Sequence, residues 1–510
     1  MVLCGLIGAI GLWDAFAWFR GDETAKFVAI AQFGAVGVGL LIGGILLRVT
    51  RGCDYYLGRR EALLRVGVTW LVGAAVAALP YFLWALLSPR APETHPFHTF
   101  ADCYFEAMSG LTTTGASVLG TAPSDIESLP AGLLLWRATT HWIGGLGIVV
   151  LFVAVLPTLG VGGKKMFQFE TTGPTKAGVR PRIRETARIL WLIYFGMTLL
   201  EILLLKFAGM GWFDAVCHTF ATLATGGFST KNASVAAYDS VGIEVIIIIF
   251  MVLAGVNFGL YYQLIRGRVS AVFKDTEFRV YLSIIAVASV ILILFLMHEP
   301  IIDATGMQTQ ASFGQAVRHG VFNAISIQTT TGFATADFDQ WPFFPKAVLI
   351  TLMFIGASAG STGGGIKVIR IWIMIKVLLA EVERMFRPNV VRPLRVGHTV
   401  IDHDLKLATL AYIMGILVLF LIGSMLIMAL EVNNEALTRI GKPITFGTAA
   451  TASIATLNNI GPGLELVGPV QNYGFFTSAS KIVMSILMAL GRIEVYAIFA
   501  LFVPRFWRRE

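Results

Sequence analysis

The chain has 510 residues, of which 56% are hydrophobic and 14% charged, and its formal net charge at pH 7 is +8. Its long apolar stretches exceed the roughly 20 residues that a helix needs to cross a bilayer, which argues against soluble domains and against alternating β-barrel strands. The basic residues are dispersed between these stretches, so the positive charge does not indicate nucleic-acid binding. Four cysteines (Cys4, Cys53, Cys103 and Cys217) show no metal-ligand spacing and call for no disulfide. The composition predicts an all-α polytopic membrane protein.

Ten membrane-spanning helices are expected along the chain. The first lacks a basic n-region and is soon followed by a second, so we interpret it as a signal anchor. The expected spans are 2–19, 27–47, 64–87, 132–157, 188–208, 242–265, 279–297, 346–380, 405–430 and 475–503. We divide the chain into an N-terminal helix pair with a basic connector, 1–60, and four repeat units, 61–185, 186–277, 278–400 and 401–510.

The distribution of Lys and Arg predicts the orientation. Basic residues gather in the connectors at 164–184, 266–274 and 384–395 and at the C-terminus, all on one side of the expected membrane. The opposite side carries acidic residues such as Asp125, Asp239 and Asp337. By the positive-inside rule, both termini are cytoplasmic and the segments between the paired spans enter from outside.

A short, uncharged Thr/Gly motif recurs once in each repeat unit. Small residues stand six positions before its glycine (Ser109, Ala221, Ser326 and Ala455), and each motif follows a segment too short to span. Such segments fit re-entrant half-helices, and four non-helical loops at membrane depth would have to converge on one axis to be buried. The four copies are Thr112-Thr113-Thr114-Gly115, Ala224-Thr225-Gly226-Gly227, Thr329-Thr330-Thr331-Gly332 and Asn458-Asn459-Ile460-Gly461.

A second repeat lies in the last span of each unit, where Gly144, Gly255, Gly356 and Gly491 follow the motif glycines by similar distances. For Gly144 and Gly255, close helix packing and a functional role stay open as alternatives. Gly356 opens the segment 356–365, which is too rich in glycine for a regular helix because each Gly costs about 1 kcal/mol against Ala. We expect a broken helix there, near the midplane.

The residue types of the four motifs suit a cation that leaves water. Rings of backbone carbonyls replace a hydration shell without fixed charge, and glycine accepts the φ values that point carbonyls inward. Thr hydroxyls can add oxygens or tie the loop to its walls. The motifs contain no carboxylate, which argues against a site for divalent cations.

These motifs together resemble the Trk/Ktr/HKT superfamily of potassium transporters, most closely the bacterial Trk-type membrane subunit. The resemblance covers nearly the whole chain, including the N-terminal helix pair. The segments that carry it are 110–116, 226–230, 360–370 and 457–463, with further similarity at 159–163, 181–187 and 491–495.

The resemblance implies four linked helix–pore-loop–helix repeats in pseudo-four-fold arrangement around one pore, with the sixteen motif residues as a selectivity filter. Gly115 at the position where some plant relatives carry serine favours K⁺ over Na⁺. It also implies a location in the bacterial cytoplasmic membrane, a homodimer, and a cytoplasmic nucleotide-binding regulatory subunit. No covalent cofactor is expected, and K⁺ is the transported ion. The implied gate consists of Gly356, Gly360, Ser361, Thr362, Gly363, Gly364, Gly365, Lys367 and Arg492.

Four further polar residues in apolar surroundings leave alternatives open. Arg492 either stands in the ion path as a barrier, or pairs with Glu494 or bonds to carbonyls of 356–365. Lys367 and Arg370 are either gate charges or anchors at the cytoplasmic end of a span. His141 is interpreted as a hydrogen-bonded histidine on a packed helix rather than a proton relay.

A proton- or sodium-coupled carrier of another cation or small solute is the alternative function. Carriers more often show inverted repeats, whereas here all four units enter from the same side. An enzyme finds no support, because the sequence shows no His/Asp/Glu cluster and no nucleophile–base pairing.

Overall fold

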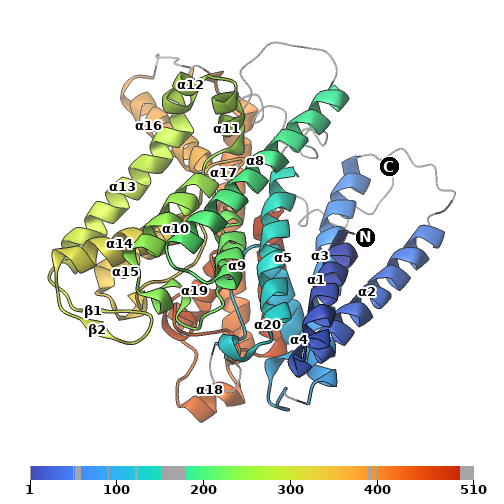
Figure 1. Cartoon of the computed structure of the whole chain (residues 1–510). Coiled ribbons are helices and arrows are strands. Elements are labelled where there is room, and N and C mark those ends of the chain that lie inside the picture. Colours follow the sequence, from blue (N-terminus) through green and yellow to red (C-terminus); the bar gives the residue numbers. More distant parts are fainter. Residues whose placement is uncertain are drawn as a thin grey trace.

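The computed structural model describes residues 2–49, 51, 59–89, 91–120, 125–150, 179–388, 393–397 and 399–493. Within these residues the protein is almost entirely helical, with two small antiparallel strand pairs (Figure 1). Six of the helices described are long and apolar enough to cross a membrane, or up to seven if one bent pair counts as a single span. The predicted helical membrane fold is thereby confirmed.

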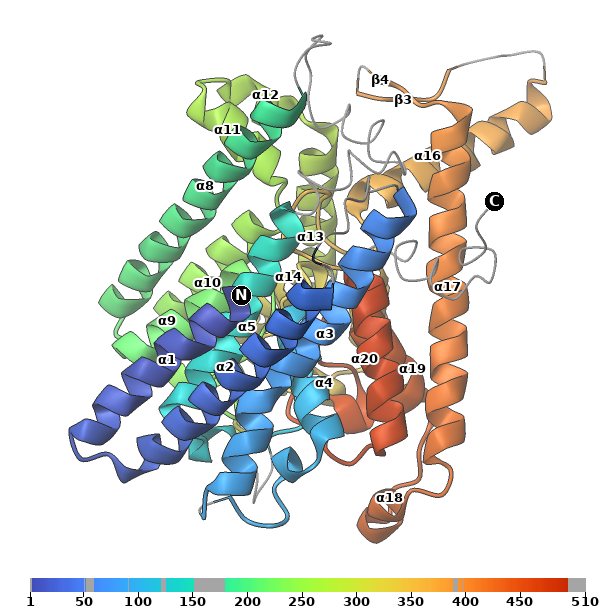
Figure 2. The same cartoon turned by 90° about the vertical axis from the view of Figure 1, so that its right-hand side faces the viewer.

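Helices α1 (Val2–Phe19), α2 (Glu23–Val49) and α3 (Arg59–Leu87) pack in sequence at one side of the molecule (Figures 1 and 2). α1 also contacts α5 (Ala131–Val150). At this contact, a Cβ on Gly132 would lie 2.0 Å from a carboxylate oxygen of the buried Asp14. The N-terminal helix pair therefore packs closely against the first turn of α5.

From α3 onward one arrangement occurs four times. A long outer helix packs against a half-length helix, a loop follows, and an inner helix returns. The outer helices are α3, α8 (Val179–Phe207), α13 (Thr276–Leu296) and α17 (His403–Glu431); the half-length helices are α4 (Phe100–Leu111), α9 (Trp212–Leu223), α14 (Phe313–Gln328) and α19 (Phe446–Leu457). The inner helices are α5, α10 (Val241–Ala254), α15 (Phe343–Phe354) and α20 (Ser478–Arg492).

The four units close into a circuit. Each inner helix packs against the half-length helix of the next unit: α5 on α9, α10 on α14, α15 on α19, and α20 back on α4. The half-length helices are therefore surrounded by their own outer helix and by a neighbouring unit. This arrangement positions four equivalent loops around one axis. The exact boundaries of the units stay a prediction.

In the apolar interior, ion pairs support two of these contacts and also the contact between α4 and α5 within the first unit. Lys481 on α20 lies 2.5 Å from Asp102 on α4, and Arg318 on α14 binds Glu244 on α10 at 2.7 Å. Arg137 on α5 binds Glu106 on α4 at 2.8 Å. Charges in such surroundings require partners, because an isolated buried charge is costly.

The expected span 242–265 is not a single straight helix. α10 ends at Ala254, and α11 (Phe258–Ile265) continues at a bend of 92°. Gly255 caps the C-terminus of α10, and the Asn257 side chain accepts a hydrogen bond from the Gly259 N–H at 2.6 Å, which starts the new helix. Glycine and asparagine are common residues at these two cap positions. We call residues 255–257 the elbow.

In the third unit, the backbone between α15 and α16 (Val368–Phe386) is not helical, where the sequence predicts a break. The expected spans 132–157 and 475–503 begin as α5 and α20, and their remainders lie outside the described residues, as do the motif at 159–163 and Glu494. The remaining named elements are short: α12 (Val269–Lys274), α18 (Glu435–Ile440), β1 (Ile301–Ile302) with β2 (Gln308–Thr309), and β3 (Arg395–Val396) with β4 (Thr399–Val400).

The glycines inside α5 and α20 allow the closest helix contacts. A Cβ on Gly144 would lie 2.0 Å from the Leu111 carbonyl oxygen, and one on Gly491 would lie 1.7 Å from the Leu457 carbonyl oxygen. Leu111 and Leu457 are the last residues of α4 and α19. The structure thus shows close helix packing at Gly144.

We therefore expect Gly144→Ala to lower the free energy of unfolding by about 1–3 kcal/mol, because a Cβ cannot be accommodated against a backbone carbonyl. Thermal unfolding of purified protein in detergent measures this loss. Gly147→Ala is the control on the same helix, since its Cβ would have no neighbour nearer than 3.8 Å. Equal melting temperatures for the two variants would contradict the packing argument.

Candidate functional site

The four repeat loops, 112–115, 224–227, 329–332 and 458–461, share one backbone conformation. In each loop the residue before the glycine donates its N–H to the carbonyl six positions before the glycine, at 2.8–2.9 Å. The residue two before the glycine has a positive φ, which is uncommon for a residue with a Cβ. These φ values are 52° for Thr113, 53° for Thr225, 58° for Thr330 and 56° for Asn459; those of Gly115, Gly227, Gly332 and Gly461 are 79°, 79°, 80° and 98°. The fourth loop keeps this conformation although its sequence differs.

The loops touch one another in a ring. A Cβ on Gly115 would lie 2.0 Å from the carbonyl oxygen of Gly226, the residue before the next glycine. The same approach occurs from Gly227 to Thr331 at 2.0 Å and from Gly332 to Ile460 at 2.0 Å, and Gly461 closes the ring against Thr114 at 2.6 Å. Any side chain at these glycines would push against a neighbouring carbonyl. Glycine is therefore required at these four positions for two reasons: a Cβ would clash with a neighbouring carbonyl, and the φ angle is positive.

Thr hydroxyls tie the first and third loops to their own half-length helices. Thr112 Oγ1 donates to the Met108 carbonyl at 2.6 Å, and Thr329 Oγ1 donates to the Ile325 carbonyl at 2.8 Å. Each hydroxyl also lies 2.8 Å from the hydroxyl of the Thr two residues later. Of the two roles expected for these hydroxyls, attachment to the wall is the one observed.

In the fourth loop, Asn458 and Asn459 take over this attachment and extend it to neighbours. Asn458 Nδ2 donates to the Met353 carbonyl of α15 at 2.7 Å. Asn459 Nδ2 donates to Thr114 Oγ1 of the first loop at 2.9 Å and to the Met488 carbonyl of α20 at 3.0 Å. The departure from Thr/Gly therefore replaces hydroxyls by amides that bridge units.

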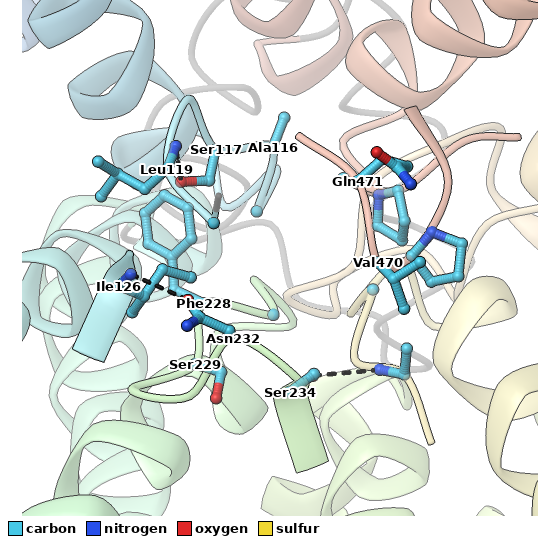
Figure 3. Close-up of a pocket in the computed structure, with 18 of the residues that line it drawn as sticks. Ala116, Ser117, Leu119, Ile126, Phe228, Ser229, Asn232, Ser234, Val470 and Gln471 are labelled. Atoms are coloured by element: carbon cyan, nitrogen blue, oxygen red, sulfur yellow. Dashed lines mark hydrogen bonds between the residues drawn. The ribbon is translucent and has the colours of Figure 1, made fainter. Parts of the chain in front are cut away.

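All four glycines line one hollow of about 640 Å³, which we call the vestibule (Figure 3). Its walls include the chain segments that follow the glycines, with Ala116 and Ser117 from the first unit and Val470 and Gln471 from the fourth, and the cationic residues Arg137 and Lys231 also line it. Within the part of the chain that the structure describes, no Asp or Glu lines it, and no group of His, Cys, Asp and Glu could hold a metal ion. Uncharged oxygens backed by the C-terminal ends of four helices suit a monovalent cation.

Residues 356–365, the glycine-rich loop, cross the opposite end of the repeat loops, where the half-length helices end. A Cβ on Gly364 would lie 2.5 Å from the Asn458 carbonyl oxygen, and one on Gly363 would lie 3.1 Å from that of Thr329. The Gly364 N–H donates to Thr330 Oγ1 at 2.7 Å. The glycine-rich loop therefore lies directly against the third and fourth repeat loops.

The glycine-rich loop forms several of its hydrogen bonds with the second unit. The N–H of Ser358 donates to the Gly255 carbonyl at 3.0 Å, and that of Thr362 to the Ala254 carbonyl at 3.3 Å. Thr362 Oγ1 donates to the Leu223 carbonyl at 2.9 Å. In return, the Phe258 N–H donates to the Gly360 carbonyl at 3.0 Å. The elbow and the residues beside it thus supply several of the groups that satisfy the glycine-rich loop, and Glu277 supplies another by accepting a hydrogen bond from the Ala359 N–H at 2.8 Å.

Two buried cationic side chains donate hydrogen bonds to carbonyls of the glycine-rich loop. Arg492 is 3% exposed, and its guanidinium donates to the Thr362 carbonyl at 2.7 Å and to the Gly144 carbonyl at 3.4 Å. Lys367 is also buried and donates to the Gly363 carbonyl. Both line a small cavity with Gly363–Gly365 and Gly491. Arg492 therefore makes the expected carbonyl bonds and also borders this cavity.

Two other sequence interpretations change in detail. Arg370 is buried with its guanidinium 3.9 Å from the centre of the Tyr412 ring, so it is not an exposed anchor. His141 is packed as expected and stacks on Phe228 at 4.1 Å. Its ring nitrogens make no hydrogen bond to any described residue, so the expected hydrogen-bonded state is wrong.

Sequence reasoning missed the polar residues that hold the chain just past the glycines. Glu106 and His218 lie on half-length helices and bind Ser117 and Ser229, each two residues after its glycine. Arg137, on α5, joins both segments. The available signal was a charged residue within an apolar span, which usually has a buried partner or a function.

Comparison with known proteins agrees with this geometry. The sequence model of the TrkH family, described as a cation transport protein, matches residues 57–509. The chain is 38% identical to the Trk system potassium uptake protein TrkH of Salmonella typhimurium over 92% of this chain and 91% of the relative. It is 35% identical to that of Halomonas elongata over 100% and 95%. The crystal structure of the potassium transporter TrkH from Vibrio parahaemolyticus matches over 100% of both chains, with a TM-score of 0.80 and 30% identity. This is a family of transporters and not of enzymes, and the chain belongs to the TrkH family of cation transport proteins.

Proposed function

We propose that this protein takes up potassium ions across the membrane through the ring of the four repeat loops, which acts as a selectivity filter. The observation that carries the proposal is the closed contact of each loop glycine with the carbonyl before the next glycine. Relatives that match over nine-tenths of this chain are named as potassium uptake proteins. The resemblance found in the sequence points to the same ion.

The physical argument is one of dehydration. A cation entering the ring exchanges water for backbone carbonyls, which bind it without fixed charge and so allow it to leave. The half-length helices α4, α9, α14 and α19 end four residues before their glycines and direct their partially negative C-terminal ends toward the ring. The positive φ of each glycine keeps the carbonyls in a conformation that other residues rarely adopt.

The experiment that tests this function is ⁸⁶Rb⁺ uptake into vesicles that contain the purified protein. We expect uptake that unlabelled K⁺ competes for at lower concentration than Na⁺. Absence of selective uptake would refute the proposal. Repeating the measurement with and without a proton gradient separates it from a coupled carrier, for which uptake of the ion would require the gradient.

The coupled carrier is the weaker alternative because of the symmetry of the units. All four inner helices pack on the next half-length helix in the same sense around the circuit. Carriers with alternating access are more often built from inverted repeats.

The first variant prediction concerns the ring. In Gly332→Ser, the Cβ would lie 2.0 Å from the Ile460 carbonyl oxygen, so the carbonyls must shift. We expect Rb⁺ over Na⁺ discrimination to fall by about ten-fold, because a change of 1.4 kcal/mol in relative affinity is ten-fold. Gly306→Ser is the matched control, since Gly306 also has a positive φ of 86° but no atom within 4 Å of its Cβ position. Unchanged flux ratios in Gly332→Ser would count against the filter assignment.

We further propose that the glycine-rich loop is the gate, with Lys367 and Arg492 holding it. The position of the loop supports this proposal. The loop lies against two repeat loops on the side away from the vestibule, and it is almost entirely buried. Non-helical backbone at membrane depth is tolerated only inside protein or beside a wet cavity. A loop held by hydrogen bonds rather than by apolar side chains can leave and return without exposing a core.

We expect Thr362→Val to raise basal Rb⁺ uptake, since it removes the hydroxyl bonds to the Leu223 and Ala254 carbonyls while keeping side-chain size. A net loss of about 1 kcal/mol would change the open population by about five-fold. Shortening the loop by Gly363 and Gly364 should act in the same direction.

The control is Thr351→Val, whose exposed hydroxyl bonds only the Ala347 carbonyl of its own helix. Basal uptake of Thr362→Val that equals that of the control, in protein of normal amount and size, would speak against a gate at this loop.

The proposal extends to the cellular location, the orientation and the protein partners of the chain. We place it in the bacterial cytoplasmic membrane with both termini in the cytoplasm, as a homodimer that a cytoplasmic nucleotide-binding subunit regulates. The support is the clustering of basic residues in the connectors on one side of the spans, together with the family resemblance.

A further inference from the structure

We propose that the buried ion pair between Glu106 and Arg137 is a positioning device that sets the geometry of the first and second repeat loops and thereby the discrimination between ions. This inference rests on the proposed function, because it concerns the selectivity of the same ring. It gives Glu106 and Arg137, which lie outside the ring, a role in determining which ions the ring selects.

Glu106 holds the chain that leaves the first loop. Its carboxylate is fully buried on α4 and accepts hydrogen bonds from Ser117 Oγ at 2.9 and 3.1 Å. It also accepts one from the Val118 N–H at 3.0 Å. Ser117 follows Gly115 by two residues and lines the vestibule. The carboxylate therefore fixes the outgoing arm of the loop on its own half-length helix.

Arg137 joins this arm to the second loop. The side chain is 1% exposed, and its Nε donates to Glu106 at 2.8 Å. One terminal nitrogen donates to Ser117 Oγ at 3.2 Å, and the other to the Ser229 carbonyl at 3.2 Å. The guanidinium also lies 4.1 Å from the centre of the Phe228 ring. Phe228 and Ser229 directly follow Gly227, so one side chain contacts the outgoing arms of two adjacent loops.

The position occupied by Glu106 recurs in the repeat. Nine residues before the other glycines stand His218, Asn323 and Ala452. His218 Nε2 lies 3.0 Å from Ser229 Oγ, and Asn323 Nδ2 donates to Thr335 Oγ1 at 3.2 Å. The second and third units thus hold the same outgoing arm with an imidazole and an amide. Ala452 cannot make such a bond, so three of the four units keep this task at the position, each with different chemistry. That pattern is better explained by the geometry of the loops than by a need for an ion pair as such.

Because the repeat loops contact one another in the ring, the attachment of the outgoing arms affects the position of the ring carbonyls. Gly115 and Gly227 are each in contact with the next carbonyl, so a shift of either outgoing arm moves a carbonyl of the ring. Groups that hold a binding site need to be locked by neighbours to within about half an ångström. Charge-assisted hydrogen bonds are shorter and stronger than neutral ones and therefore suit this task.

The test compares Glu106→Gln with Glu244→Gln by Rb⁺ and Na⁺ uptake in vesicles. Gln keeps the size of the side chain but removes the charge that Arg137 requires. Glu244 pairs with Arg318 through two hydrogen bonds of 2.7 and 2.9 Å, between the second and third units, and neither bond reaches a repeat loop. We expect the Rb⁺/Na⁺ uptake ratio to fall at least three-fold in Glu106→Gln and to stay unchanged in Glu244→Gln, even where both variants lower the amount of folded protein.

Ser117→Ala is the second variant, because it removes only a hydroxyl at the edge of the vestibule and spares the ion pair. It should lower the same ratio by a smaller factor. A wild-type ratio in Ser117→Ala or in folded Glu106→Gln would overturn the inference while leaving the proposed function intact. Loss of selectivity in Glu244→Gln as well would also overturn it, since breaking any buried ion pair would then suffice. Failure of the unmodified protein to take up Rb⁺ selectively would instead refute the proposed function.

Discussion

The structure depends on the need to satisfy backbone polar groups that are not helical inside a membrane. Four repeat loops and one glycine-rich loop interrupt the helices at depth, where water is scarce and an unpaired carbonyl or N–H is costly. Each half-length helix meets part of this need, because the residue before the glycine bonds back to its last turn. The remainder comes from other units: amides of Asn458 and Asn459, the hydroxyl of Thr362 and the guanidinium of Arg492. The circuit of helices exists to bring these donors and acceptors together.

Four-fold repetition of the backbone coexists with strong differences in side chains. The loop conformation is the same in all units within about 20° of φ at the glycine. The inner helices are not the same: α5 continues past Gly144 and α20 ends one residue after Gly491, whereas α10 and α15 end before Gly255 and Gly356. A single polypeptide can therefore keep a common ring while each unit carries different supporting contacts, which four identical subunits could not do.

Much of this architecture was predictable from the amino-acid sequence. The motif glycines, the small residues six positions earlier and the half-length segments specify local backbone geometry, and local geometry is what short patterns encode. The elbow was missed because Gly255-Val256-Asn257 lies within a strongly apolar run, and hydropathy outweighed its cap residues. The bond from Ser358 to the Gly255 carbonyl explains why the break is stable, and that bond joins residues about 100 positions apart.

Side-chain partners that are far apart in the sequence were the least predictable part of the candidate site. Glu106 and Arg137 are 31 positions apart, and the contact of Arg137 with Ser229 spans 92. No periodicity relates such pairs. His141 shows the opposite failure, since its ring is held by stacking on Phe228 from another unit rather than by the hydrogen bonds usual for buried polar groups.

The elbow has a thermodynamic consequence for the segment it holds. Withdrawing residues 356–365 by themselves would strip the Ala254 and Gly255 carbonyls of donors, at about 1–3 kcal/mol for each group left bare. Displacement of both together avoids that loss, so α11, which begins directly after the elbow at Phe258, would be displaced with the segment if the segment moves as proposed. Because coupling between two sites is reciprocal, a contact near Ile265 that favours the present position of α11 would then also favour the present position of the segment.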